Sequence, residues 1–122
     1  MLKNLLILSL FVSILLVCKS QNDTWIDDGK VSYLAGCRFK TLKRAGYIKN
    51  SKGDTRTACF DKCSATKVPL CTHFEWIGKT QKANSSCWLF KWNVTKNDTR
   101  RIKNKEHYCG IMNQNKTIQL QF

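Results

Sequence analysis

The chain has 122 residues and carries 21 lysine and arginine residues against 8 acidic residues, a formal net charge of +13. These 122 residues allow one small domain with a modest hydrophobic core and exclude several domains. The charge favours an anionic partner, and the 7 cysteines indicate that disulfide bonds help to stabilise the domain.

Residues 1–20 have the features of a secretory signal peptide. Lys3 precedes an apolar run over 5–17, and the small residues Cys18 and Ser20 suit cleavage after Ser20. The run is shorter than the roughly 18 residues of a membrane span, which disfavours a membrane anchor. Cleavage also removes Cys18 and leaves an even number of cysteines, as an oxidising compartment favours. We therefore expect a secreted, extracellular protein without a membrane span.

Without residues 1–20, the chain keeps 102 residues with 19 basic and 8 acidic side chains, a net charge of +11. Outside the cell, sulfated or sialylated glycans and acidic proteins are commoner partners for such a charge than nucleic acid. Five Asn-x-Ser/Thr sequons agree with secretion, because such motifs mark surface positions of secreted chains. The sequons begin at Asn22, Asn84, Asn93, Asn97 and Asn115.

The first part of the mature chain is predicted to contain a polar tail, a strand and a basic loop. Residues 21–29 are polar and end in a turn-like Asp-Asp-Gly sequence. Alternating apolar residues over 31–35 then predict a strand. The segment 43–53 is predicted to be a basic loop with a short strand around Tyr47.

A helix is expected over 57–65, a stretch without glycine or proline. Asp54 or Thr55 is a suitable N-cap residue for it. Cys59 and Cys63 are four residues apart, so a helix places them on one face, one turn above the other. We expect disulfide bonds to fasten that face to the structure beneath it.

Residues 71–77 alternate in the manner of a strand. Phe74 and Trp76 are expected on one side of it, and His73 and Glu75 on the other.

Residues 87–92 predict a second strand, with Trp88, Phe90 and Trp92 on the face opposite Cys87. The remaining segments are predicted to be loops over 78–86 and 93–105, a closing strand over 106–111 around Cys109, and a tail over 112–122.

The spacing of these cysteines and aromatic residues resembles the core of the PAN/apple domain family. The matching residues are Ala58-Cys59-x-x-x-Cys63, Cys71-x-x-Phe74-x-Trp76 and Cys87-x-Leu89. The resemblance covers about residues 37–109, which is most of the mature chain.

This resemblance implies a small disulfide-rich α+β domain over residues 30–111, in which one helix packs across an antiparallel sheet of about five strands. It implies nested disulfide bonds, Cys37–Cys109, Cys59–Cys87 and Cys63–Cys71, among the pairings that six cysteines allow. It also implies binding rather than catalysis, because members of the family bind proteins or carbohydrates, including heparin. No family binding motif carries over, and this chain differs from better-known members in being a lone domain.

Seven basic side chains between positions 38 and 56 form the main candidate ligand-binding site. Asp54 is the only acidic residue between positions 30 and 57, and no sequon lies over 30–83. Clustering matters because sulfate and carboxylate groups need several cations within about 8 Å, the Debye length at physiological salt. The alternative is a solvated basic surface without a ligand. The candidate residues are Arg38, Lys40, Lys43, Arg44, Lys49, Lys52 and Arg56.

A second basic cluster lies in the segment predicted to be a loop before the closing strand. Its residues are Lys96, Arg100, Arg101, Lys103 and Lys105. The sequons at Asn93 and Asn97 adjoin it, so attached glycans would hinder a large partner there.

The aromatic residues Trp88, Phe90 and Trp92 are a further candidate contact surface. Aromatic faces stack on sugar rings or anchor protein partners. The alternative is that they lie on a second, covered face of the sheet.

Neither a metal nor a cofactor is expected. His73 and His107 are the only histidines, and zinc-type spacing is absent. A ribonuclease-like pair of imidazoles and a lysozyme-like pair of carboxylates, Glu75 and Glu106, are catalytic alternatives that no local sequence signature supports. We therefore expect a protein that is not an enzyme.

Together these observations predict a secreted, non-catalytic module that binds an anionic glycan or an acidic protein surface. One alternative is an adhesion or effector module that binds a protein through its aromatic strand residues. A second is a cationic antimicrobial or toxin-like effector, which the lack of a long amphipathic basic helix disfavours. The ligand, the oligomeric state and the sequons that carry glycans are left open.

Overall fold

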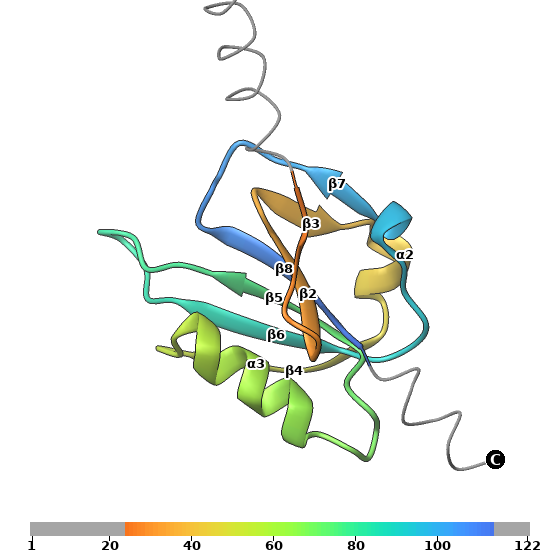
Figure 1. The fold of residues 1–122 in the computed structure, drawn as a ribbon. Coiled ribbons are helices and arrows are strands. Elements are labelled where there is room, and N and C mark those ends of the chain that lie inside the picture. The colour runs from red at the N-terminus through yellow and green to blue at the C-terminus, as the bar shows by residue number, and fades with distance from the viewer. Residues whose placement is uncertain (1–23, 114–122) are drawn as a thin grey trace, which may run out of the picture.

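The computed structural model describes residues 24–113. The predicted signal peptide, the sequons at Asn22 and Asn115 and most of the predicted C-terminal tail lie outside these residues. The fold is α+β, with a six-stranded antiparallel sheet, a two-stranded ribbon and one main helix (Figure 1). The sheet has the strand order β1-β2-β8-β5-β6-β4. Its strands are β1 Ile26–Asp27, β2 Val31–Ala35, β4 Tyr47–Lys52, β5 His73–Ile77, β6 Ser86–Phe90 and β8 His107–Met112.

The sheet has six strands, so the prediction of about five is wrong by one. The additional strand is β1, which lies in the segment predicted to be a polar tail and pairs with β2. The carboxylate of Asp28 accepts hydrogen bonds from the backbone N–H groups of Lys30 and Val31. This local bonding makes a tight turn that folds β1 back along β2.

The segment predicted to be a loop over 93–105 contains a 3-10 helix, η2 (Lys96–Asp98), and a strand, β7 (Thr99–Arg101). β7 pairs with β3 (Cys37–Phe39) to form the two-stranded ribbon. Strand periodicity cannot reveal β7, because it has three residues and two of them are arginine. The segment 43–53, predicted to be a basic loop with a short strand around Tyr47, holds the whole of β4, and β4 follows a short helix, α2 (Thr41–Arg44).

The predicted main helix is confirmed as α3 (Arg56–Ala65). Thr55 is its N-cap, and its hydroxyl accepts the N–H of Ala58 at 3.1 Å. At the other end, the N–H and hydroxyl of Thr66 both donate to the carbonyl of Lys62. These contacts satisfy backbone groups that a helix terminus otherwise leaves unpaired.

The three disulfide bonds are those that the family resemblance implies. Cys59–Cys87 fastens α3 to β6, and Cys63–Cys71 fastens α3 to the segment just before β5. Cys37–Cys109 fastens β3 to β8. All six cysteines of residues 24–113 are fully buried. Phe74 and Leu89 pack among the four cysteines of the two disulfide bonds at α3. Sulfur atoms therefore supply much of the core on this face.

The opposite face of the sheet is covered by β3, α2 and the residues around them. The ring of Phe39 lies edge-on to His73, with 4.6 Å between their centroids, and 6.4 Å from Phe90. Both faces of the central strand β5 are therefore buried, which explains why the consecutive residues His73, Phe74 and Glu75 have almost no exposed surface.

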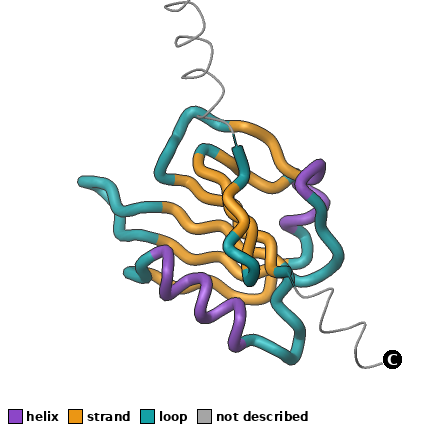
Figure 2. The backbone as a smooth tube through the Cα atoms, in the orientation of Figure 1, coloured by secondary structure: helices purple, strands orange, loops and turns teal. Residues whose placement is uncertain are grey.

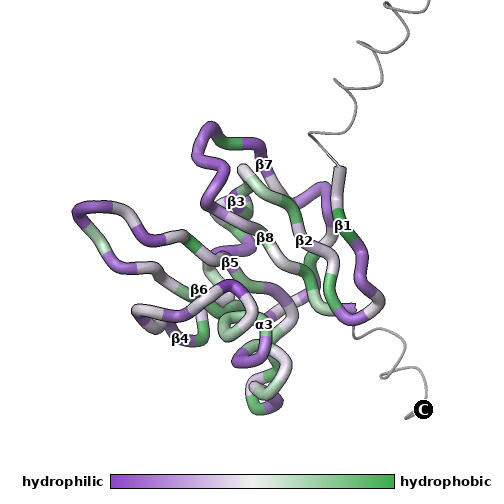
Figure 3. Tube along the Cα trace, turned by 60° about the vertical axis from the view of Figure 1, so that its left-hand side comes forward, coloured by the Kyte–Doolittle hydropathy of each residue, from purple (hydrophilic) through white to green (hydrophobic). Residues whose placement is uncertain are grey.

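The loops gather at the two ends of the sheet, as Figure 2 shows. At one end of the sheet, β4 and β5 begin and β6 and β8 end, and we call this the Tyr47 end. At the opposite end, β4 and β5 end and β6 and β8 begin, and we call this the Lys52 end. The long β5–β6 loop projects from the Lys52 end. Figure 3 shows hydrophilic residues concentrated in this loop and in the segment after β7.

Candidate functional site

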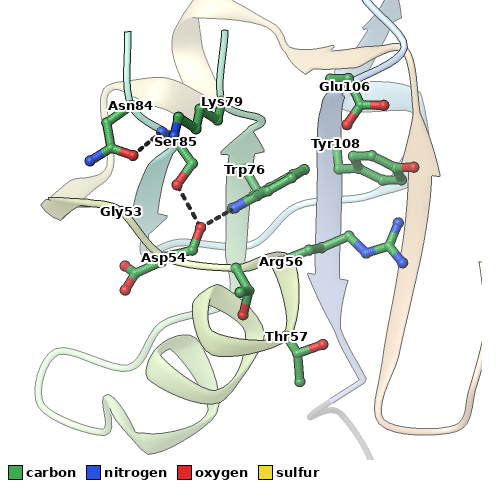
Figure 4. Close-up of a pocket in the computed structure, with 11 residues that line it drawn as sticks. Gly53, Asp54, Arg56, Thr57, Trp76, Lys79, Asn84, Ser85, Glu106 and Tyr108 are labelled. Atoms are coloured by element: carbon green, nitrogen blue, oxygen red, sulfur yellow. Dashed lines mark hydrogen bonds between the residues drawn. The ribbon is translucent and has the colours of Figure 1, made fainter.

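A hollow of about 770 Å³, open to solvent, lies at the Lys52 end, where the N-terminus of α3 meets β5 and β8 (Figure 4). It forms because α3 begins only at Arg56 and leaves the last part of the sheet uncovered on this face. Trp76 of β5 and Tyr108 of β8 are Cα partners and line the hollow together. Lys79, Asn84 and Glu106 also line it.

Aromatic rings from three neighbouring strands lie side by side on this face. The ring centroids of Trp76 and Tyr108 are 5.8 Å apart, and those of Tyr108 and Tyr33 are 6.5 Å apart. The indole N–H of Trp76 donates to the backbone carbonyl of Asp54 at 2.9 Å, and Ser85 donates to the same carbonyl at 2.7 Å. These bonds fix the orientation of the Trp76 ring.

Arg56 crosses this row of rings. Its guanidinium lies 4.5 Å from the ring centroid of Tyr108 and 5.3 Å from that of Tyr33. Both distances allow a cation–π interaction. A second hollow of about 280 Å³, lined by Ile26, Tyr33 and Tyr108 among others, lies beside the first and shares Arg56 with it. Arg56 thus separates two adjoining depressions.

The charged groups at the larger hollow are not balanced. Arg56 and Lys79 are basic, and Glu106 is acidic. Figure 4 shows the carboxylate of Asp54 pointing away from Trp76, and it bonds Lys62 at 2.8 Å and Ser51. Hydrogen bonds from these two side chains hold the pKa of Asp54 below its usual value. The hollow therefore presents two cations and one free carboxylate.

The structure distributes the seven predicted basic residues over four places. Of these residues, only Arg56 lines the large hollow. Arg38 lies on β3 and Lys40 just after it, Lys43 and Arg44 lie in α2, and Lys49 and Lys52 lie on the edge strand β4. The seven residues therefore do not form one compact patch around a single hollow.

Two of these residues already have acidic partners. Arg44 Nε donates to Oε2 of Glu75 at 2.8 Å. The Lys43 ammonium donates to the carbonyl of Asn93 at 2.6 Å and lies 4.0 Å from the Asp98 carboxylate. These contacts hold α2 on the sheet, so both side chains have structural roles.

Glu75, which the sequence suggested only as part of a lysozyme-like pair, is a buried charged group with a structural role. Its side chain has no exposed surface, and Oε1 accepts the backbone N–H of Phe39 at 3.0 Å. The imidazole Nε2 of His107 lies 3.4 Å from the same oxygen. Burial alone raises the pKa of Glu75, but His107 and Arg44 beside it lower it more, and the net pKa lies below its usual value.

The second basic cluster meets the first on the β3–β7 ribbon, where Arg100 is the Cα partner of Arg38. Arg101 lies opposite Cys37. The ammonium of Lys96 lies 5.6 Å from the ring centroid of Trp25. Sequence distance concealed the proximity of Arg38 and Arg100, because the pairing joins segments about sixty residues apart (Figure 1).

The three predicted aromatic residues do not share one surface. Phe90 is buried at 1% exposure, beside Phe39 and His73. Trp88 is half-buried, and Arg44 lies 5.9 Å from its ring centroid. Trp92 lies beyond the end of β6, at a positive φ of 82°, and is 52% exposed. The predicted strand over 87–92 therefore ends two residues early, at Phe90.

The two histidines occupy different buried settings. His73 Nε2 lies 3.1 Å from the carbonyl of Lys43, which can only accept, so Nε2 carries the proton. Its ring stacks on Phe90 with 5.1 Å between centroids. Burial lowers the pKa of His73 to about 4. His107 instead lies beside Glu75.

The three sequons within the described residues, at Asn84, Asn93 and Asn97, all have exposed asparagines. Across residues 24–113, no group of three or more His, Cys, Asp and Glu side chains is placed to hold a metal ion. Within the same residues, no helix has the length and apolar character needed to cross a membrane.

Comparison with known proteins gives no match to a family model, to a curated protein or to a solved structure. The PAN/apple resemblance therefore rests on the residue spacing, and it is carried below as part of a proposal.

Proposed function

We propose that this chain is a secreted PAN/apple-like binding module that holds an acidic carbohydrate in the hollow beside Arg56. The observation that carries the proposal is the position of the Arg56 guanidinium, over the rings of Tyr108 and Tyr33 and at the rim of the hollow. The disulfide framework supports secretion, since such bonds persist in oxidising compartments.

The chemistry of the hollow suits a sugar that carries a carboxylate or sulfate group. An aromatic ring packs against the apolar face of a pyranose ring, and Trp76 and Tyr108, whose rings are tilted by 57° to each other, each bring one ring to the hollow. Arginine presents several N–H donors in a fixed plane, which matches the oxygens of a carboxylate or sulfate. Arg56 and Lys79 are placed to bind that group, while the carboxylate of Glu106 is placed to bind hydroxyl groups.

Net charge adds to this local recognition. A strongly basic protein attracts polyanions at long range, so encounter with an acidic glycan is favoured before specific contacts form. The local contacts then decide which glycan stays bound, because stacking and the guanidinium geometry depend on shape.

A glycan array probed with the secreted protein tests the proposal. We expect retention on sialylated or sulfated glycans and little on their neutral counterparts. Repeating the incubation at rising salt separates the two contributions, because the charge-driven part weakens steeply with ionic strength. Equal signals on acidic and neutral glycans, or no signal on any, would contradict the proposal.

A further inference from the structure

Large hydrophobic side chains are exposed mainly at the Tyr47 end of the sheet, the end opposite the candidate hollow. Of the five most exposed ones in the described residues, four belong to this end: Leu42 at 82%, Tyr47 at 47%, Val68 at 95% and Trp92 at 52%. The fifth, Ile26 at 53%, lies on the far edge strand β1.

The topology explains why these four residues belong to the same end of the sheet. β4 begins at Tyr47, and the Cα partner of Tyr47 is Phe90, the last residue of β6. Phe90 is also the partner of His73, the first residue of β5. The α2–β4 corner, the loop before β5 and the residues after β6 therefore meet at one end of neighbouring strands (Figure 1).

The outward position of Trp92 is held by several specific contacts. A positive φ is uncommon for a residue other than glycine, and it persists only when the surroundings fix it. The hydroxyl of Thr72 donates to the carbonyl of Trp92, and the N–H of Lys91 donates to the carbonyl of Gly46 at 2.7 Å. The ring of Trp92 packs over Gly46, where an added Cβ would lie 2.5 Å from the Lys91 carbonyl oxygen.

Lysines surround these apolar residues. Lys67 precedes Val68 and is exposed. The ammonium of Lys91 lies 5.9 Å from the ring centroid of Trp92. Lys49 follows Tyr47 on the edge strand and is also exposed. The carboxylate of Asp98 lies 4.0 Å from the ammonium of Lys43. The surface thus combines apolar tips with a positive rim.

We propose that the Tyr47 end docks on the surface of an anionic lipid bilayer. Aromatic residues with a polar tip favour the membrane–water interface, and lysines near the surface are attracted by anionic headgroups. The exposed apolar residues lie on separate backbone turns and project individually, an arrangement that suits insertion among headgroups. This docking uses single side chains from α2, the start of β4 and two loops rather than one amphipathic helix, and it leaves the candidate hollow at the Lys52 end facing away from the bilayer.

Co-sedimentation with sucrose-loaded vesicles tests the proposal. The protein is produced by secretion from cells that attach N-glycans, because the sequon at Asn93 adjoins Trp92. One vesicle set contains phosphatidylcholine alone, and the other also contains phosphatidylserine. We expect binding to the anionic set only. The double variant Leu42→Ser, Val68→Ser is expected to bind about tenfold more weakly, whereas Ile26→Ser, which removes a 53% exposed apolar side chain at the far edge, is expected to bind like the wild type.

A charge-reversed pair gives a second, independent comparison. Lys67→Glu with Lys91→Glu should abolish binding, while Lys82→Glu with Lys103→Glu, which changes the net charge equally away from the Tyr47 end, should retain most of it. Brominated lipids should quench fluorescence of the wild type more than that of a Trp92→Phe variant. The proposal is overturned if the secreted protein does not bind anionic vesicles, or if the two members of either variant comparison behave alike.

Discussion

Arg44 and Glu75 form an ion pair between α2 and the centre of the sheet, with 2.8 Å between Nε and Oε2 and no exposed surface on the Glu75 side chain. The same carboxylate accepts the N–H of Phe39. One buried charge therefore joins α2, β3 and β5, and it fixes the covered face of the sheet.

Glu75→Gln should destabilise the protein by about 3 kcal/mol or more, because it leaves the Arg44 charge without a partner at a partly buried position. Lys62→Met, which breaks the more exposed pair with Asp54, should cost less than about 1 kcal/mol. Denaturant unfolding of both variants measures the difference. Equal losses would show that Glu75 does not organise this face.

His73 makes stability depend on pH between about 6.5 and 4. Its pKa is about 4 in the folded protein, against an ordinary 6.5, so the unfolded chain binds the proton first as the pH falls. Stability contributed by neutral His73 is therefore lost progressively from pH 6.5 to pH 4, by at most about 3 kcal/mol.

His73→Gln should flatten this part of the profile when the free energy of unfolding is measured at successive pH values. Glu75 acts at lower pH: its pKa is lowered, so its contribution is complete above its ordinary value of 4.5 and is lost as the pH falls through the folded pKa. An unchanged profile above pH 4.5 in His73→Gln would count against the assignment to His73.

The disulfide bonds should contribute unequally to stability. Cys37–Cys109 spans 72 residues and Cys63–Cys71 spans 8. If the bonds act mainly by restricting the unfolded chain, replacing the longer-range pair by alanine costs about 2 kcal/mol more than replacing the shorter. Thermal and denaturant unfolding of the two double variants under oxidising conditions gives the comparison. Equal costs would place the stabilisation in native contacts of the sulfur atoms.

Gly110 allows the ring of Phe74 to cross β8, since an added Cβ there would lie 2.2 Å from the ring. Gly110→Ala should therefore cost about 1–3 kcal/mol through overpacking. Adding Phe74→Leu should recover part of this loss, so the two substitutions should be non-additive in a double-mutant cycle. Gly29→Ala is the matched control, because no neighbour lies within 4 Å of the added carbon and only its positive φ opposes the change.

The sequence was sufficient to predict the main helix, a cap at Asp54 or Thr55, of which Thr55 is the one used, and four of the strands close to their observed bounds. These elements have strong local signals, namely a helix-compatible run with a capping residue and alternating aromatic and apolar residues. The nested disulfide pairing was predicted from the family resemblance and is confirmed.

Elements without periodicity were missed. β1 and β7 have two and three residues, and each exists only because a partner strand supplies its hydrogen bonds. The role of Arg44 was also hidden, since nothing local distinguishes an arginine that pairs with a buried glutamate from a solvated one. The aromatic hollow depends on where α3 begins relative to the sheet, which is a tertiary property.

The central claim, that the hollow beside Arg56 binds an acidic carbohydrate, is tested most directly by titration calorimetry of two arginine variants against sialyllactose and a heparin oligosaccharide. Arg56→Ala and Arg38→Ala remove the same charge from different places. The account predicts that Arg56→Ala weakens binding of at least one of these ligands about tenfold or more, while Arg38→Ala leaves its affinity nearly unchanged. Equal affinities for the two variants, or a larger loss in Arg38→Ala, would contradict the account.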